Sequence, residues 1–208
     1  MNEFFQEHPK IKKFMINQEK VLIKHGYIKS LFGRKRRLPQ VYSDNEQEAA
    51  YAVRLSVNMP CQSAASDMTL FASILNYWKM RQGILPYMPE TCTVHDAVYY
   101  LADPQDVNVW VVYNIWETCR NPDTKKYFGF EINDVSMSMD ITIGRSMAEE
   151  LPFIPGYDYN KMFEPDFNTD EYLEEHRKYK NIDISEYPKL YKKAVSYTHL
   201  TLPTTPYV

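Results

Sequence analysis

The sequence lacks the features that mark several classes of protein. No apolar stretch reaches the roughly 20 residues of a membrane-spanning helix, and no apolar core with a small-residue cleavage site follows the N-terminal lysines as in a secretory signal. The three cysteines, Cys61, Cys92 and Cys119, lie far apart and form no CxxC pair, which argues against zinc binding and dithiol redox chemistry. We expect them to be reduced core residues of a cytosolic protein that has no membrane partner.

The length and composition of the chain are typical of one globular domain or of one and a half. Hydrophobic residues make up 44% of its 208 residues and charged residues 25%, enough to bury a core. The charge is unevenly distributed, because residues 1–37 hold ten Lys or Arg against three acids and the rest hold 14 against 24. Such a basic end is either a solvated face or the electrostatic footprint of a polyanion, so nucleic acid becomes a partner worth testing.

Periodicity and turn residues predict a mixture of helices and hairpins. Helices are expected at residues 9–25, 46–57, 64–81 and 169–180, the last short and charged, and also after a cap at Asp103. Hairpins are expected at residues 27–38 and around His95-Asp96, and residues 128–143 fit one bent strand or a hairpin broken at Asn133-Asp134. Pro60 separates two of the helices, so helical spacing is not assumed across it.

Apolar spacing also predicts which faces are buried. The helix at 64–81 is expected to bury a stripe made of Met68, Phe71, Ile74 or Leu75, and Trp78. The helix after Asp103 carries Trp110 and Trp116, and we expect it to be deeply packed. After Gly144 the chain is acidic and rich in tyrosine, and we expect only peripheral packing there.

Asp96 is the most informative single residue, because it places a carboxylate inside the strand-like apolar run 91–100. An unpaired buried carboxylate costs several kcal/mol, so such a group lies at a turn, finds a partner or binds a metal. The pair His95-Asp96 suits the tight turn of a β-hairpin. A simple turn and a metal ligand both remain open at this point.

Three segments, in order along the chain, resemble motifs of family A DNA polymerases. They are Gly-Arg-Lys-Arg-Arg-Leu-Pro at 33–39, Arg-Leu-Ser-Val-Asn-Met-Pro-Cys-Gln-Ser-Ala-Ala-Ser-Asp at 54–67, and Val-His-Asp at 94–96. With flanking matches at 4–9 and 140–144, the resemblance covers about residues 3–147. It implies an α+β fold, namely the C-terminal part of a polymerase palm in which antiparallel strands carry the catalytic Asp and pack on α-helices.

The resemblance implies template-directed DNA synthesis, in which a nucleotide is transferred from a dNTP to a primer 3′ end with two Mg²⁺ ions. By this resemblance Asp96 is one of two metal-binding carboxylates, and His95 contacts the primer end. Mg²⁺ prefers hard oxygen ligands, which carboxylates supply. The implied partners are primer-template DNA and dNTP, and the implied location is the cytoplasm of a bacterium or a phage-infected host.

The same resemblance implies two groups of DNA contacts. Arg54, Asn58 and Gln62 match positions that approach the primer-template through its backbone or minor groove, where acceptors are nearly common to all base pairs. The cations Arg34, Lys35, Arg36 and Arg37 would hold duplex phosphates, a contact that carries no sequence information. Simpler readings are a turn between helices at Asn58 to Pro60, a cap at Gln62 and a solvated basic hairpin.

The chain departs from the family pattern at several positions. The second metal carboxylate and the nucleotide-binding helix do not appear in it, and we expect them upstream of Met1, so the chain is expected to be inactive alone. Ala97 stands where many members have Glu, Ser63 replaces a glycine and Met147 replaces a common Trp. The change at Ala97 puts a third carboxylate in doubt and leaves Asp96 intact.

We expect three parts in the chain: a partial palm at 1–147, an acidic C-terminal extension at 148–195, and a tail at 196–208. The tail holds four threonines and two prolines but no Asp, Glu, Lys or Arg, and it resembles a translated sequencing adaptor, so we exclude it from the native domain. Two other functions stay open. One is a non-catalytic nucleic-acid-binding module; the other, a His/Asp metal hydrolase, ranks lowest because one His-Asp pair gives too few ligands.

Overall fold

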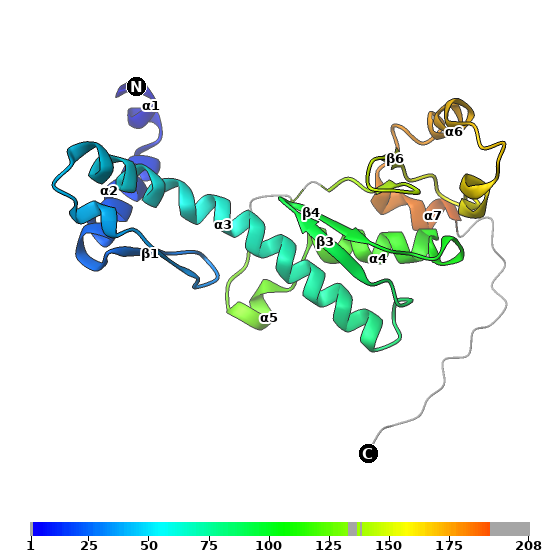
Figure 1. Ribbon diagram of the computed structural model, residues 1–208, viewed down its shortest axis with the longest axis horizontal. Coiled ribbons are helices and arrows are strands. Elements are labelled where there is room, and N and C mark those ends of the chain that lie inside the picture. Colours follow the sequence, from blue (N-terminus) through cyan, green and yellow to red (C-terminus); the bar gives the residue numbers. More distant parts are fainter. Residues whose placement is uncertain (1, 133–136, 138, 192–208) are drawn as a thin grey trace, which may run out of the picture. The chain divides into compact units, whose positions relative to one another are not determined.

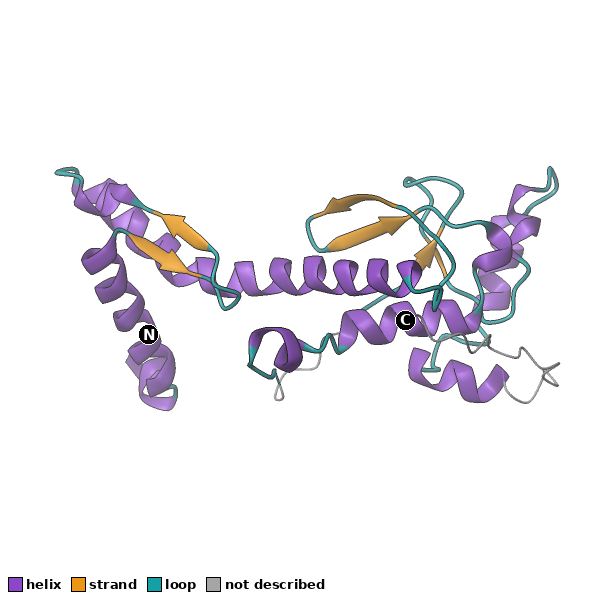
Figure 2. Ribbon diagram, turned by 90° about the horizontal axis from the view of Figure 1, so that it is seen from below, coloured by secondary structure: helices purple, strands orange, loops and turns teal. Residues whose placement is uncertain are grey.

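The computed structural model describes residues 2–132, 137 and 139–191 (Figure 1). Its helices are α1 (Asn2–Glu7), α2 (Pro9–His25), α3 (Glu46–Arg81), α4 (Val109–Arg120), α5 (Thr124–Phe128), α6 (Thr169–His176) and α7 (Tyr187–Tyr191). Its strands are β1 (Tyr27–Lys29), β2 (Lys35–Arg37), β3 (Glu90–Val94), β4 (Ala97–Tyr100), β5 (Thr142–Ile143) and β6 (Leu151–Pro152). They form small two-stranded sheets, which Figure 2 shows among the helices, so the predicted α+β class is confirmed.

The described chain forms two compact units. The first contains residues 2–73, Thr93–Val98 and Asp123–Glu131, and the second contains Ile74–Cys92, Tyr99–Pro122 and the described residues from Ile132 onward. The expected boundary at residue 147 remains a prediction. The tail predicted at 196–208 and the break predicted at Asn133-Asp134 lie outside the described residues.

In the first unit, α2 ends at a turn that leads directly into the β1–β2 hairpin. Gly26 adopts a left-handed conformation with φ 69°, and its N–H donates to the carbonyl of Leu22. The carbonyl of Gly26 in turn accepts from the N–H of Leu38 at 2.9 Å, which closes the hairpin against the helix end. The buried cluster of this region consists of Leu22, Ile28, Leu38, Ala52 and Met59. The helix and hairpin predicted at 9–25 and 27–38 are confirmed.

Helix α3 runs without a break from Glu46 to Arg81, so the predicted separation into two helices at Pro60 is wrong. Proline inside a helix removes one backbone hydrogen bond and costs about 3 kcal/mol. Burial of Met59 and Met68 on either side of Pro60 offsets this cost, because a fully buried side chain of this size contributes about 1.5–3 kcal/mol.

The buried stripe of α3 also differs from the prediction towards its end. Met68 and Phe71 are buried as expected, and Leu75, the alternative to Ile74, is partly buried. Ile74 and Trp78 are more than half exposed. The buried positions continue instead through Ala72, Asn76 and Met80, which follow one another at helical intervals of four.

Helix α4 begins later than the sequence predicted. Asp103 precedes a short 3₁₀ turn, and Asn108 caps α4 by accepting from the N–H groups of Trp110 and Val111, each at 3.1 Å. Trp116 is buried, whereas Trp110 is half exposed, so the expected deep packing holds for one face only.

The residues after Gly144 form most of the largest buried cluster of the second unit, which corrects the expectation of peripheral packing. Phe153, Ile154 and Tyr172 pack there with Val109 and Val112 of α4. Aromatic side chains bury large areas, and their hydroxyls need partners when buried. The hydroxyl of Tyr172 donates to the carbonyl of Pro152 at 2.6 Å, and burial raises the pKa of Tyr172 to about 12.

The stretch 128–143, predicted as one bent strand or a hairpin, is a strand only at its end among the residues that the structure describes. Phe128 closes α5, and Gly129 follows with φ 76°. The described residues of this stretch become a strand only at Thr142 and Ile143, where β5 pairs antiparallel with β6. Within the described residues, the alternating apolar and polar pattern therefore includes both the end of α5 and the short strand β5.

The cysteines are all free, but they are not all core residues. Cys61 is exposed, and Cys92 and Cys119 are half-buried. Burial raises the pKa of the Cys119 thiol to about 11. Cys119 lies beside Asn76, whose side-chain amide approaches the sulfur to 3.6 Å. The prediction of buried cysteines is thus wrong for Cys61.

Candidate functional site

The pair His95-Asp96 forms the turn that joins β3 to β4, as predicted. His95 has φ 56°, and it is the one non-glycine residue with positive φ among those the structure describes. Both residues are exposed. Asp96 therefore avoids the desolvation cost of a buried carboxylate, and its oxygens are accessible to a cation in solvent.

The basic hairpin consists of β1, β2 and the loop between them. Its strands pair antiparallel, with Tyr27 opposite Arg37, Ile28 opposite Arg36 and Lys29 opposite Lys35. The four cations at 34–37 are exposed, as is Lys29, which sequence reasoning had not selected. The signal that identifies Lys29 is the register of the hairpin, which places it directly opposite Lys35.

Asp67 links the basic hairpin to α3. The residue is only 7% exposed. One oxygen lies 2.7 Å from Nε of Arg34, and the other accepts from the hydroxyl of Ser30 at 3.0 Å. The hydroxyl of Ser30 accepts from the backbone N–H of Arg34 at 3.1 Å. Sequence reasoning missed this group, although an acid next to the buried Met68 was a sign that it needed partners.

Aromatic packing fixes the loop of the hairpin to the same helix. The ring of Phe32 lies 6.5 Å from Phe71 of α3, 4.8 Å from Phe128 and 5.2 Å from Phe130, measured between centroids. Phe71 follows Asp67 by one helical turn, so a polar and an apolar contact hold the loop on one stretch of α3.

Arg54, Asn58 and Gln62 lie on α3 and are all exposed. Because the helix continues through Pro60, their spacing of four residues places them along one face, within an arc of about 80°. The alternatives of a turn between helices at Asn58 and a cap at Gln62 are therefore wrong. The guanidinium carbon of Arg54 lies 5.7 Å from the ring centre of Tyr51.

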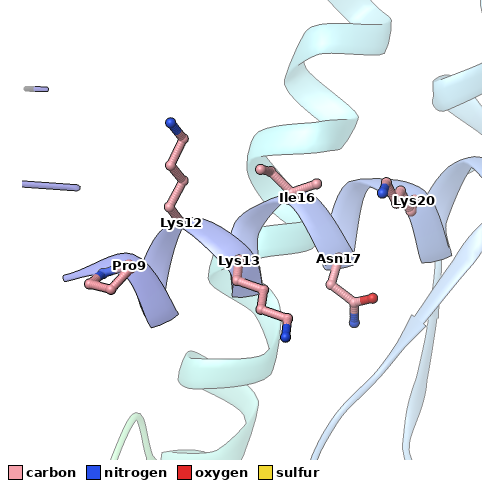
Figure 3. Close-up of a pocket in the computed structure, with 6 residues that line it drawn as sticks. All are labelled: Pro9, Lys12, Lys13, Ile16, Asn17 and Lys20. Carbon is pink, nitrogen blue, oxygen red and sulfur yellow. The ribbon is translucent and has the colours of Figure 1, made fainter. Parts of the chain in front are cut away.

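A hollow of about 350 Å³ lies along α2 and is lined by Pro9, Lys12, Lys13, Ile16, Asn17 and Lys20 (Figure 3). All six residues come from one helix, and Lys12 and Lys13 extend to opposite sides of it in Figure 3. A hollow on one helix has few converging polar groups, unlike most ligand pockets. We regard it as part of the lysine-rich surface of α2 and not as a substrate pocket.

The described residues contain no group of three or more His, Cys, Asp or Glu that could hold a metal ion. None of the described helices has the length and apolar content that crossing a membrane requires. Asp96 thus supplies a single carboxylate on an exposed tip. It belongs to the same compact unit as the basic hairpin and the exposed face of α3 that carries Arg54, Asn58 and Gln62.

Comparison with known proteins identifies the family. The family model described as DNA polymerase family A matches residues 1–149. The chain belongs to this family. Its family A relatives include DNA polymerase I of Caldicellulosiruptor bescii, 33% identical over 85 residues that cover 41% of this chain and 10% of the relative. The DNA polymerase of Bacillus phage SP01 is 28% identical over 201 residues, covering 96% of this chain and 20% of the relative.

Among solved structures, the chain is similar to the polymerase domain of Pol1 from M. smegmatis, which was solved in complex with DNA primer-template and dNTP. The TM-score is 0.47 with 22% sequence identity, over 58% of this chain and 20% of that one. This family A chain spans about a tenth to a fifth of the length of the curated relatives named above.

Proposed function

We propose that this chain forms the primer-side part of the palm in a template-directed DNA polymerase. The observation that carries the proposal is the exposed Asp96 at the tip of the β3–β4 hairpin, within the segment that matches the family and in the same unit as the basic hairpin. Within that unit, the exposed row of Arg54, Asn58 and Gln62 on α3 supplies hydrogen-bond donors and acceptors suited to DNA.

Asp96 fits one protein ligand of a Mg²⁺ site. Mg²⁺ keeps several waters and is usually bound by one or two carboxylates together with substrate phosphates. Asp96 would hold such an ion, and the chemistry that bound Mg²⁺ would supply there is stabilisation of the charge on the attacking and leaving oxygens of nucleotide transfer. The role of Asp96 is to hold cation charge at the primer end, and the role of His95 is to contact that end from the adjacent turn position.

The DNA contacts of the proposal come from α3 and the basic hairpin. Asn58 and Gln62 carry amide donors that suit the acceptors of the minor groove, and Arg54 lies one turn before them on the same face. The basic hairpin contributes a salt-dependent attraction to duplex phosphates. Together these contacts bind any sequence, as a replicative reaction in a bacterial or phage-infected cytoplasm requires.

The relatives are five to ten times longer than the matched part, and we propose that this chain does not add nucleotides by itself. The test therefore uses a full-length parent polymerase that contains this chain. Asp96→Asn keeps the size of the side chain but removes its charge, and it should lower Mg²⁺-dependent primer extension at least about a thousandfold. Binding of primer-template should be largely unchanged.

Asp44→Asn is the matched control, because Asp44 is an exposed carboxylate of the same unit, outside the hairpin tip. It should leave extension unchanged. Retained extension by the Asp96→Asn enzyme would overturn the assignment of a metal ligand. Duplex binding without any extension by the full-length parent would favour the alternative, a non-catalytic nucleic-acid-binding module that uses the basic hairpin.

A further inference from the structure

We infer that one face of the basic hairpin, formed by Lys29, Lys35 and Arg37, contacts duplex DNA phosphates, and that Arg34 is a positioning residue held by Asp67. The inference rests on the proposed DNA-binding function and gives its phosphate contacts a specific location. It adds Lys29 to the cations selected from the sequence and removes Arg34 and Arg36 from direct phosphate contact.

The register of the hairpin separates its cations into two faces. Residues directly opposite each other in an antiparallel pair point to the same side, and successive residues alternate. Ile28 is opposite Arg36 and is 1% exposed, so the face that carries Arg36 is turned towards the buried cluster of the first unit. The other face carries Lys29, Lys35 and Arg37 together with Tyr27.

A side-chain contact supports this separation. The ammonium group of Lys35 lies 4.9 Å from the ring centre of Tyr27, its diagonal neighbour on the second face. Arg36 is itself exposed, so register and not exposure distinguishes it from the other cations. We call the surface of Lys29, Lys35 and Arg37 the outer hairpin face.

The outer hairpin face carries a charge arrangement that is unfavourable by itself. Lys29 and Lys35 are directly opposite, and like charges in this position destabilise a pair of strands. Residues 26–42 contain no Asp or Glu that could offset them. A polyanion relieves the repulsion, and DNA presents one negative charge per about 1.7 Å of its axis. The arrangement therefore suits duplex phosphates better than an isolated hairpin.

Arg34 has a different environment. Its Nε binds the buried carboxylate of Asp67, and its backbone N–H and carbonyl both bond to Ser30, at 3.1 and 2.8 Å. Asp67 follows Gln62 by about one and a half turns of α3. The contact thus ties the hairpin to the helix that presents the proposed DNA-binding row. Its consequence is a fixed position of the outer hairpin face relative to that row.

The first experiment measures binding of this chain to a fluorescently labelled DNA primer-template duplex from 50 to 200 mM salt. The variants Lys29→Gln, Lys35→Gln and Arg37→Gln should each make the slope of log affinity against log salt less steep by about 0.9. From 50 to 200 mM salt, each variant should therefore lose about threefold less affinity than the wild type loses. Arg36→Gln is the matched control on the other face and should leave the slope unchanged. An equal effect of Arg36→Gln, or no effect of Lys29→Gln, would overturn the inference.

The second experiment separates positioning from phosphate contact at Arg34. Asp67→Asn releases Arg34, so it should tighten DNA binding if Arg34 contacts phosphate and weaken it if Arg34 positions the hairpin. Arg34→Lys keeps the charge but loses the guanidinium geometry. If Arg34 positions the hairpin, Arg34→Lys should weaken DNA binding several-fold. The double variant of Arg34→Lys and Asp67→Asn should then bind DNA no more weakly than Asp67→Asn alone. Wild-type affinity of Arg34→Lys contradicts a positioning role even if Asp67→Asn fails to fold.

Failure of this inference is distinguishable from failure of the proposed function. Salt slopes of duplex binding test which cations contact DNA, whereas primer extension by a full-length parent tests Asp96 and nucleotide addition. An unequal effect of the two hairpin faces together with undiminished extension by Asp96→Asn would support the inference and reject the metal assignment. Equal slopes for all hairpin variants with lost extension by Asp96→Asn would do the reverse.

Discussion

Arg34 and Asp67 form an ion pair of 2.7 Å between the basic hairpin and the middle of α3. The side chain of Asp67 is 6% exposed and that of Arg34 is 55% exposed, so the pair joins a buried acid to a base that reaches solvent. A buried carboxylate is stabilised only while its partners are in place. This pair therefore makes the position of the hairpin depend on a residue far along the chain.

Loss of the Arg34 side chain is expected to destabilise the first unit. Arg34→Ala leaves Asp67 bound to the hairpin only through the hydroxyl of Ser30 among the described contacts, and we expect the free energy of unfolding to fall by about 1–2 kcal/mol. Urea denaturation followed by circular dichroism measures the change. Lys125→Ala removes the exposed pair with Glu131 and serves as a control that should not shift the transition. Equal transitions for both variants would contradict a structural role of Arg34.

The cap of α4 gives a second prediction with an internal control. Asn108→Ala removes the acceptor for two backbone N–H groups and should lower stability by about 1 kcal/mol. Asp103→Ala should have little effect, because the side chain of Asp103 makes no capping hydrogen bond. Thermal melting of the two variants compares them directly. A larger loss at Asp103 would restore the helix start predicted from the sequence.

Stability should fall at alkaline pH because of Cys119. Burial raises the pKa of its thiol from 9.0 to about 11. Between about pH 9 and pH 11 the unfolded chain loses this proton while the folded chain keeps it, so the free energy of unfolding falls as pH rises, by at most about 1.4 kcal/mol per pH unit. Cys119→Ala should flatten this dependence, and Cys61→Ala, at an exposed position, should not. Parallel pH profiles for wild type and Cys119→Ala would exclude the effect.

The backbone of His95 gives a fourth prediction. A left-handed conformation costs a non-glycine residue about 1–2 kcal/mol, so His95→Gly should raise stability by up to about 1 kcal/mol. In a full-length parent, the same change should slow primer extension about tenfold if the imidazole makes one hydrogen bond to the primer end. His95→Asn tolerates the same backbone but lacks the ring, and it should also slow extension. Full activity of both variants would leave His95 only its role in the turn.

Local features of the fold were predictable because they depend on neighbouring residues. Pro9 at the first position and Gly26 after the last turn define α2, and the pair His95-Asp96 makes the tight turn of its hairpin. The start of α4 was misplaced because Asp103 and Asn108 both suit a cap, and only the backbone path shows which one meets free N–H groups.

The sequence by itself determined the family, through ordered motifs whose residue types are visible without any structure, and it located the carboxylate Asp96 at a turn. Only the tertiary structure decided that Asp67 holds Arg34, that α3 continues through Pro60 and that tyrosines such as Tyr172 form a core. The physical reason is how far apart in the sequence the interacting residues lie. Capping and turn formation involve residues a few positions apart, whereas burial and ion pairing depend on which distant segments the folded chain brings into contact.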